Sequence, residues 1–502
     1  MPLPFVHSVI AWLLKRRKHQ IDLFLKYPHE VQKELLNRLL YIAEETEVGK
    51  KYDFSTIENY ETFAKRVPIQ QYESIEPLIE RVRQGEQNVF WPTTIKWFAK
   101  SSGTTNAKSK FIPVSDEALE ECHFNIGKDL LCLYLSNNED TELFVGKGLR
   151  LGGSSAIYED NNSYFGDLSA IIIENLPFWA DLNSSPKQEV ALMSEWETKM
   201  EAIVDETIQE DITSLYGVPS WMLVLCNKVL EKTGKQNLLE VWPNLEVYFH
   251  GGVNFNPYRE QFKKLIPSEK FKYYETYNAS EGFFAIQDQN NSSELLLMLD
   301  YGIFYEFIPM SHFNGENSTA IPLEQVELDT NYALLITTNA GLWRYLIGDT
   351  IKFTSLNPHR IKITGRTKHF INTFGEELII DNTEEAIKRA CAQTDAVVNE
   401  YTVAPIYMNG QKSGGHEWMI EFSEFPSNFD DFSKIIDDTL KTINSDYEAK
   451  RYLNMALAFP KINVARQHLF YDWLKQKGKL GGQNKVPRLS NSREFMEELL
   501  EM

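Results

Sequence analysis

Hydrophobic and polar positions follow a helical period over residues 18–90. The segments HEVQKELLNRLLYIAEET and TIENYETFAKRV place apolar residues three and four positions apart, which predicts amphipathic helices. Pro68 and Pro77 predict breaks between these helices. Further along, SDEALEECHFNIGKDLLCLYL predicts another helix, with Ser115 as its N-cap and acidic residues in its first turn.

The middle of the chain alternates between strand patterns and helix patterns. The stretches ELFVGKGLRLGG, LEVYFHGG and KYYETYNASEG predict strands that end in glycine or in small and acidic residues. Helical patterns lie between them, as in GVPSWMLVLCNKVLEKTG and PYREQFKKLI. This order predicts an α/β domain with largely parallel sheets, in which ligands bind beyond the carboxyl ends of the strands.

From about residue 300 the pattern changes. The segment YALLITTNAGLWRYLIGDTIKFT predicts two strands joined by a turn at residues 339–341, as in an antiparallel meander or a small barrel. Asp381 and Glu384 have the spacing of a helix capping box. The remaining residues mix strand and helix patterns, which predicts a separate small α+β domain ending in the loop GKLGGQNKVPRLSNSREF.

Composition narrows the class of protein. A chain of 502 residues with 43% hydrophobic residues predicts two or more globular domains. The net charge of −20 argues against nucleic-acid binding, which needs a basic surface. The four cysteines form no C-x-x-C pair, so we expect free thiols and no zinc site. The apolar run FVHSVIAWLL is too short to span a bilayer and precedes its basic residues, so we expect a packed helix in a cytoplasmic protein and no membrane partner.

Several short segments carry candidate chemistry, and each also has an ordinary structural interpretation. The hydroxyl- and lysine-rich stretch from Ser101 to Lys110 is suited to phosphate binding near a helix N-terminus, but hydroxyls are also common in surface turns. Glu281 in YNASEG is either a helix cap or a ligand for a divalent cation. Asp349 in LIGDT is either a turn aspartate or a carboxylate that accepts both hydroxyls of a ribose.

The order of these segments is more specific than any one of them. A hydroxyl loop, Gly-Gly after a strand, Tyr-x-x-Ser-Glu-Gly, Gly-Asp, Gly-Arg-x-Lys and a late loop lysine follow one another, and this succession resembles the acyl-adenylate-forming superfamily. The segments SSGTTNAKSKFIP, YNASEG, GLWRYLIGD and GGQNKVPRLSN resemble the Gretchen Hagen family, the auxin-responsive acyl acid–amido synthetases and their bacterial relatives. The resemblance spans Phe98 to Arg493.

This resemblance implies both an architecture and an activity. The expected fold is a large N-terminal adenylate-forming domain with sheets, helices and a small β-barrel-like part over residues 1–365, a hinge at 366–372, and a smaller mobile α+β C-terminal domain over 373–502. The expected activity is that of a ligase which uses ATP and Mg²⁺ to activate a carboxylic acid as acyl-AMP. The acyl group then passes to the amine of an amino acid, and AMP is released. Two alternatives stay open, an acyl-CoA ligase using the same adenylation step and a non-catalytic nucleotide- or acyl-binding protein.

The resemblance also implies roles for individual residues. The expected donors to the β- and γ-phosphates are Ser101, Ser102, Gly103, Thr104 and Thr105, with charge from Lys108 or Lys110. The expected adenine and second-motif positions are Gly251, Gly252, Tyr277 and Ser280, with Glu281 as the Mg²⁺ ligand. The remaining expected roles are Asp349 on the ribose, Arg366 on ribose or phosphate, Lys368 at the hinge, and Lys485 on the α-phosphate and the acyl carboxylate.

Two positions depart from the family pattern. Ala107 stands where many relatives have glycine, and alanine stiffens the loop because it resists positive φ. His369 stands where the wider superfamily often has aspartate after the hinge. The expected partners are a carboxylic acid and an amino acid, and the expected state is a monomer or weak homo-oligomer.

Overall fold

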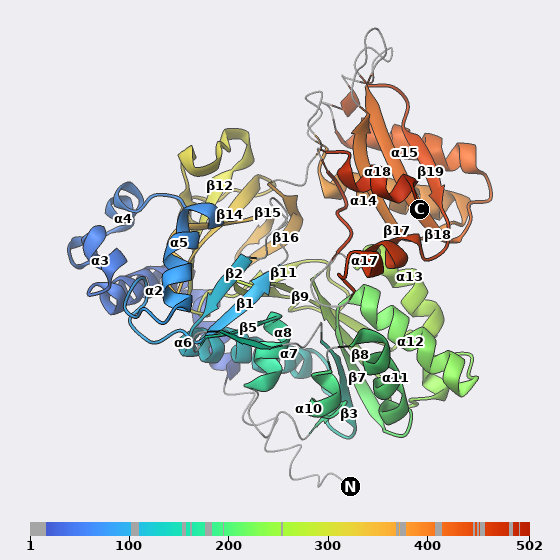
Figure 1. Cartoon of the computed structure of the whole chain (residues 1–502), viewed down its shortest axis with the longest axis horizontal. Helices are drawn as coiled ribbons and strands as arrows, with labels where there is room; N and C mark the ends of the chain where they lie inside the picture. The colour runs from blue at the N-terminus through green and yellow to red at the C-terminus, as the bar shows by residue number, and fades with distance from the viewer. Residues whose placement is uncertain are drawn as a thin grey trace. The chain divides into compact units, whose positions relative to one another are not determined.

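The chain folds into two compact units, which the computed structural model in Figure 1 shows. Unit 1 comprises Met1–Val253, Leu265–Ile347 and Ile351–Ile363, and unit 2 comprises Asn254–Lys264, Gly348–Thr350 and Thr364–Met502. The structure describes residues 17–502 except 102–109, 153–156, 161–162, 176–182, 194, 253–254, 368–370, 372–377, 407–413, 445–446, 449–450, 452–456, 481–484 and 491.

The N-terminal part of unit 1 is helical, as the period of its apolar residues predicts. Its helices are α2 (Pro28–Ala43), α3 (Glu47–Lys51), α4 (Tyr60–Arg66) and α5 (Tyr72–Arg83). The predicted break at Pro77 is wrong, because this residue lies inside α5. The buried face of α5, including Tyr72, Ile75 and Ile79, keeps the helix packed despite the hydrogen bond that proline cannot donate.

The predicted helix after residue 115 is confirmed, but it contains an irregular turn. It comprises α6 (Asp116–Ala118), a π-helical stretch (Leu119–His123) and α7 (Phe124–Asn137). The side chain of Ser115 accepts a hydrogen bond from the Ala118 amide at 3.0 Å, so the predicted N-cap is present. The π-helical stretch widens the helix by a residue and changes the direction of the side chains on it.

Among the described residues, the largest sheet has twelve strands in the order β13-β12-β14-β15-β16-β11-β10-β9-β8-β7-β3-β6. Strands β6, β3, β7, β8 and β9 are parallel, which confirms the α/β prediction, and β9–β10, β10–β11 and β12–β14 pair antiparallel. The parallel strands are β3 (Lys147–Leu151), β6 (Ser184–Ser185), β7 (Ile212–Gly217), β8 (Val247–Gly251) and β9 (Lys272–Ala279). The others are β10 (Gly282–Ile286), β11 (Leu295–Leu297), β12 (Ile303–Pro309), β13 (Ile321–Pro322), β14 (Asn331–Thr338), β15 (Tyr345–Leu356) and β16 (His359–Arg366).

A smaller sheet and several helices complete unit 1. The sheet has the order β2-β1-β5-β4, made of β1 (Trp97–Ser101), β2 (Lys110–Val114), β4 (Tyr158–Asp160) and β5 (Ser163–Gly166). The helices are α8 (Leu168–Glu174), α10 (Gln188–Ala191), α11 (Trp196–Thr207) and α12 (Pro219–Thr233). Helices α11 and α12 lie beside β7 and β8 in Figure 1 and contact each other.

Unit 2 has the predicted α+β character. Strands β17 (Val397–Ile406) and β18 (Gly415–Glu424) pair antiparallel, and β19 (Lys461–Ala465) pairs parallel with β18. Its helices are α13 (Asn256–Leu265), α14 (Ile380–Thr394), α15 (Phe429–Ile443), α17 (Leu469–Gln476) and α18 (Glu494–Leu500). The predicted capping box of Asp381 and Glu384 is wrong, because the N-cap of α14 is Ile379, two residues before Asp381, and Asn382 accepts the hydrogen bond from the Ile379 amide.

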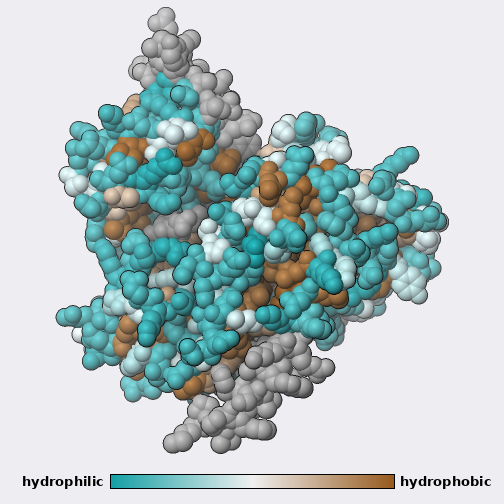
Figure 2. All heavy atoms as spheres, turned by 180° about the vertical axis from the view of Figure 1, so that it is seen from behind, coloured by the Kyte–Doolittle hydropathy of each residue, from teal (hydrophilic) through white to brown (hydrophobic). Residues whose placement is uncertain are grey.

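The polarity of the surface and the state of the cysteines match what the composition predicts. Figure 2 shows a face on which hydrophilic residues predominate and hydrophobic residues form small separate patches. The four cysteines are free thiols, as predicted, and Cys122, Cys132 and Cys226 are buried. None of the helices in the described part of the chain combines the length and the apolar run that a bilayer crossing requires.

Candidate functional site

The carboxyl ends of β8 and β9 bring two predicted motifs together in unit 1. Gly251 ends β8 and is in register with Thr276 of the parallel neighbour β9. A Cβ atom on Gly251 would lie 2.6 Å from the Thr276 carbonyl oxygen and 2.7 Å from Asn278 Oδ1, so a side chain cannot fit here. Gly252 follows with φ of +80°, a conformation that favours glycine. Close packing of β8 on β9 at Gly251 and the positive φ at Gly252 therefore both favour glycine at the carboxyl end of β8.

The YNASEG motif forms a β-hairpin rather than the start of a helix. Tyr277 lies in β9, Ser280 and Glu281 form the turn, and β10 returns antiparallel with Gly282 paired to Ala279. The interpretation of Glu281 as a helix cap is therefore wrong. Tyr277 and Ser280 are each only 3% exposed, whereas Glu281 is half-buried. The hairpin thus places the Glu281 carboxylate at the edge of the sheet, beyond the carboxyl end of β9.

Cys122 forms hydrogen bonds with the start of β10, a contact that no motif in the sequence indicates. Its Sγ accepts a hydrogen bond from the Phe283 amide at 3.2 Å and donates one to the Phe283 carbonyl oxygen at 3.6 Å. The residue lies in the π-helical stretch, and burial raises the pKa of its thiol to about 12. The thiol is therefore a neutral packing and hydrogen-bonding group for the backbone of Phe283, the second residue after Glu281.

Unit 2 brings together Asp349 and Arg366, which β15 and β16 carry. Arg366 Nε lies 2.7 Å from Asp349 Oδ1, and the two side chains are 40% and 13% exposed. A hydrogen bond of 2.9 Å between the hydroxyls of Thr364 and Thr350 links the same two strands. The ion pair orients a carboxylate that is largely shielded from water, and a guanidinium that can still reach a ligand.

Lys485 belongs to the same electrostatic cluster. Desolvation by surrounding protein atoms is the main cause that lowers the pKa of its amine from 10.5 to about 8, although the residue as a whole is exposed. The positive charge of Arg366 lowers this pKa further, and the negative charge of Asp349 raises it. At pH 7 the amine remains mostly a cation, but it releases its proton far more readily than an ordinary lysine.

The segment that carries Lys485 is attached to β17 by contacts that sequence reasoning missed. The Val403 amide donates to the Arg488 carbonyl oxygen at 2.9 Å, and the Ser490 amide donates to the Val403 carbonyl oxygen at 3.1 Å. The Arg488 guanidinium forms an ion pair with Glu400 and lies 4.5 Å from the centre of the Tyr401 ring. We call this set of contacts the β17 anchor.

Several predicted residues lie outside the described part of the chain. Residues 102–109 include Ser102, Gly103, Thr104, Thr105, Ala107 and Lys108, and residues 368–370 include Lys368 and His369. The flanks of the first segment are described. Ser101 ends β1 and pairs with Lys110 at the start of the antiparallel β2, so residues 102–109 connect the two strands of a hairpin. The Lys110 amine lies over the Tyr72 ring, 5.2 Å from its centre.

The described residues fit a divalent cation held mainly by a substrate. Within these residues no three His, Cys, Asp or Glu side chains gather into a potential metal cluster. Mg²⁺ keeps several waters and is commonly bound by one or two carboxylates together with substrate phosphates. A single carboxylate such as Glu281, at the edge of a sheet, is compatible with that mode of binding.

Family models cover most of the chain in three parts. The GH3 family N-terminal domain matches residues 17–271, the GH3 family central domain matches 296–366, and the GH3 family C-terminal domain matches 381–494. Together they include the candidate residues between Ser101 and Lys485 except Lys368, which lies between the second and third models, and the YNASEG motif. That motif falls in the interval between the first two models.

Similar sequences and structures agree with these models. The chain is 21% identical to indole-3-acetic acid-amido synthetase GH3.3 of Arabidopsis thaliana, over 93% of this chain and 90% of the relative. It is 22% identical to 4-substituted benzoates-glutamate ligase GH3.12 of the same plant, over 93% and 94%. The solved structure of GH3.15 acyl acid amido synthetase matches with a TM-score of 0.78 at 16% identity, over 94% of this chain and 93% of that one. A 2-hydroxyisobutyryl-CoA ligase matches with a TM-score of 0.61 at 12% identity, over 94% and 92%.

Proposed function

Because the chain belongs to the GH3 family, we propose that it is an ATP-dependent acyl acid–amido synthetase. The observation that carries this proposal is the match of all three family domains in order along the chain. Curated relatives named as amido synthetases and ligases align over more than nine-tenths of the chain and support the same activity.

The proposed reaction has two steps. A carboxylate is a poor electrophile because its leaving group would be oxide. Attack of the carboxylate on the α-phosphorus of ATP gives an acyl-AMP and pyrophosphate, and AMP then serves as the leaving group. The amine of an amino acid attacks the activated carbonyl, forms the amide bond and displaces AMP. The protein must neutralise phosphate charge, align the reacting atoms and exclude water.

The cluster in unit 2 is suited to the nucleotide end of this chemistry. We assign Asp349 to the ribose hydroxyls, with Arg366 orienting its carboxylate through the 2.7 Å ion pair. We assign Lys485 to the α-phosphate and the acyl carboxylate, where a cation offsets the negative charge that builds up as the two groups approach. Binding of these anions favours the protonated amine, so the lowered pKa of Lys485 rises when substrate is present.

The β8–β9–β10 region is suited to adenine and the metal ion. We assign the backbone at Gly251 and Gly252 to the adenine face, because these residues lie at the carboxyl end of the parallel strand β8, where ligands of α/β sheets bind. We assign Tyr277 and Ser280 to the same nucleotide, and Glu281 to Mg²⁺, which supplies positive charge to the phosphates. The donors at Ser101 and in residues 102–109 are assigned to the β- and γ-phosphates.

The identity of the acceptor is the point to test first within this proposal. The purified chain is incubated with ATP, Mg²⁺ and a panel of acids, with either a mixture of amino acids or coenzyme A, and the products are identified by mass spectrometry. We expect an acyl–amino acid conjugate and stoichiometric AMP. A thioester without any amide would replace the proposal by an acyl-CoA ligase, and ATP binding without either product would favour a binding protein.

The assignment of individual residues has a separate test. Lys485→Ala and Glu281→Ala are expected to lose adenylation by about a hundredfold or more, because each removes a charged contact to the reacting phosphates. Lys479→Ala is the matched control for Lys485, since Lys479 lies in the same part of unit 2 and outside the candidate residues. Adenylation at the wild-type rate in either site variant would overturn the assignment of that residue.

A further inference from the structure

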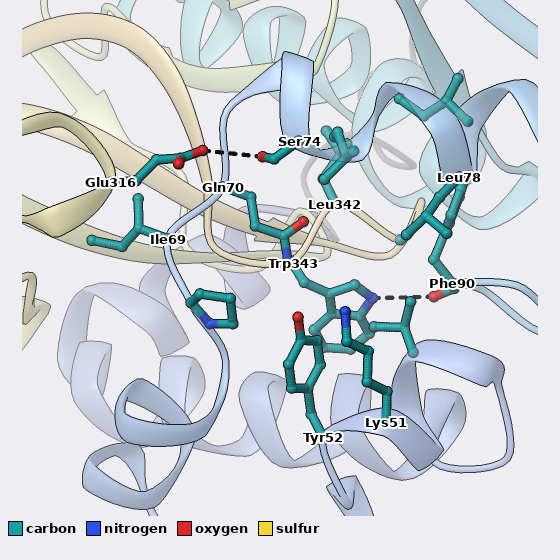
Figure 3. Close-up of a pocket in the computed structure, with 15 residues that line it drawn as sticks. Lys51, Tyr52, Ile69, Gln70, Ser74, Leu78, Phe90, Glu316, Leu342 and Trp343 are labelled. Atoms are coloured by element: carbon teal, nitrogen blue, oxygen red, sulfur yellow. Dashed lines mark hydrogen bonds between the residues drawn. The ribbon is translucent and has the colours of Figure 1, made fainter.

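A cavity of about 230 Å³ lies in unit 1 and contains none of the residues assigned to the reaction. Its lining comes from α3, α5, residues 68–70 and the turn between β14 and β15, as Figure 3 shows. An apolar cavity of about 150 Å³ is enough to bind benzene, so this one has room for a ring with a substituent. A cavity of this size and lining is a candidate binding site in its own right.

The back wall of the cavity is aromatic and held in place before any ligand arrives. Trp343 is 2% exposed, and its Nε1 donates a hydrogen bond to the Phe90 carbonyl oxygen at 3.1 Å. Its ring also lies 4.5 Å from the ring of Phe54. Gly341 has φ of +84°, and a Cβ atom there would lie 2.2 Å from Phe90 Cδ2. The wall is therefore preformed, which lowers the cost of ordering side chains around a ligand.

Polar groups enter the cavity from two sides, Gln70 from the side of Ser74 and Glu316, and Lys51 and Tyr52 from the opposite side. Lys51, Tyr52 and Gln70 all line it, and in Figure 3 the amine, the hydroxyl and the carboxamide point toward the indole of Trp343. The Lys51 amine lies over the Tyr52 ring, 5.0 Å from its centre, and forms no ion pair within 4 Å among the described residues. A cation, a hydroxyl and an amide beside an aromatic wall are suited to a carboxylate attached to a ring.

The single carboxylate in the lining is already engaged. Glu316 Oε1 accepts hydrogen bonds from the Gln71 amide at 3.0 Å and from Ser74 Oγ at 3.1 Å, at the start of α5. Figure 3 places Glu316 and Ser74 on the opposite side of the cavity from Lys51 and Tyr52. An anionic group therefore finds its favourable position next to Lys51, with the apolar part of the ligand against Ile75, Leu78 and Trp343.

We propose that this cavity is a second small-molecule site, which binds an aromatic carboxylate of about one ring through Lys51, Tyr52 and Gln70, with the ring packed on Trp343. The site adjoins the start of β15. The Gln70 amide donates to the Arg344 carbonyl oxygen at 2.9 Å, and the Leu346 amide donates to the Gln70 carbonyl oxygen at 2.8 Å. A ligand here contacts residues on both sides of this backbone pairing. The proposal does not depend on the proposed ligase activity.

The test uses the full chain labelled with 5-fluorotryptophan and no ATP. The ¹⁹F signal of Trp343 is assigned by its absence in Trp343→Phe, and phenylacetate is the probe. We expect this signal to shift in a saturable manner, with a dissociation constant of about 1 mM or lower. Phenylacetamide, which has the same shape without the charge, is expected to bind at least about fivefold more weakly.

Three variants test whether phenylacetate binds in this cavity. Lys51→Gln is expected to weaken binding about fivefold, since the lost contact is a partly exposed ion pair. Leu78→Phe is expected to fill the cavity and abolish the shift. Lys50→Gln, which removes the neighbouring exposed lysine paired with Glu45, is expected to bind as wild type does. An unmoved Trp343 signal at ten times the expected dissociation constant, or equal binding by wild type, Lys51→Gln and Leu78→Phe, would overturn the proposal.

Discussion

At the scale of single residues, the candidate chemistry rests on charged groups that act on one another. Asp349, Arg366 and Lys485 come from three segments of the sequence, and within unit 2 they share one electrostatic environment. The pKa of Lys485 is lowered mainly by desolvation and, to a smaller extent, by the positive charge of Arg366. A lysine with a pKa near physiological pH makes activity sensitive to mild alkalinity.

The pH profile of adenylation should report this lysine. Lys485 is expected to act as a cation, so kcat/KM for acid-dependent pyrophosphate release should fall as pH rises through about 8, with loss of one proton. The profile is obtained by measuring kcat/KM for pyrophosphate release at a series of pH values between 6 and 10. In Lys485→Arg the guanidinium stays charged, so the alkaline decline should move above pH 9 even if the rate is lower. An identical decline in both proteins would assign the titration to another group.

The sequence predicts residue roles that depend on near neighbours in the chain, and it does not predict roles that depend on distant ones. The N-cap of Ser115 depends on contacts only three residues away, and it was predicted correctly. The contact of Cys122 with Phe283 depends on how a π-helical turn packs against a hairpin far along the chain. Residue type gives no information about such a contact, so the role of Cys122 was not predictable.

At the scale of elements, the periodicity of apolar residues predicts most strands and helices correctly. The wrong predictions concern where a helix begins or ends. YNASEG followed by GFFAI is compatible with a helix start or a hairpin, and pairing of β10 with β9 decides between them. The proline at position 77 predicts a helix break, yet packing of the buried face of α5 outweighs the cost of the proline. Tertiary contacts decided both cases.

The β17 anchor is an element-scale feature with a direct consequence for the loop of Lys485. Arg488→Gln and Glu400→Gln each break a pair whose side chains are 13% and 19% exposed, and the loop then loses part of its attachment. We expect kcat for pyrophosphate release to fall about tenfold, with KM for the acid little changed, because the lysine is misplaced in the transition state. Arg488→Lys should recover part of the activity.

Steady-state kinetics and thermal unfolding separate positioning from loss of fold. Arg389→Gln removes an exposed pair with Glu385 on α14 and is the matched control, for which we expect no change in kcat. Variants that lose thermal stability while keeping wild-type kcat would show that the anchor supports the fold alone.

At the scale of the whole molecule, two sets of hydrophobic cores imply two folding units. One large core is made of residues between Ile21 and Ile361, all within unit 1, and two further cores are made of residues from Ile371 onward in unit 2. In unit 2, Arg451 donates to Asp437 through Nε at 2.7 Å and Nη2 at 2.9 Å, and these side chains are 6% and 2% exposed. The division into units was expected from length and composition, whereas this buried pair was not.

Thermal unfolding should therefore resolve two transitions, and one buried pair should affect only one of them. Arg451→Ala leaves the Asp437 carboxylate with Lys441 and the Tyr447 hydroxyl but without its bidentate partner, so the free energy of unfolding of unit 2 should fall by about 2–3 kcal/mol. Arg466→Ala removes an exposed pair with Asp472, and its effect should stay below about 1 kcal/mol. Differential scanning calorimetry distinguishes these outcomes. Equal shifts of both transitions in Arg451→Ala would show that the two units unfold as one.

The central claim is that this chain adenylates a carboxylic acid. The most direct measurement is pyrophosphate release with ATP and Mg²⁺ across a panel of aromatic, fatty and hydroxy acids, with no acceptor added. We expect release that depends on the acid, favours one chemical class and is lost in Lys485→Ala. Absence of acid-dependent release across the panel, in protein shown to bind ATP, would contradict the claim.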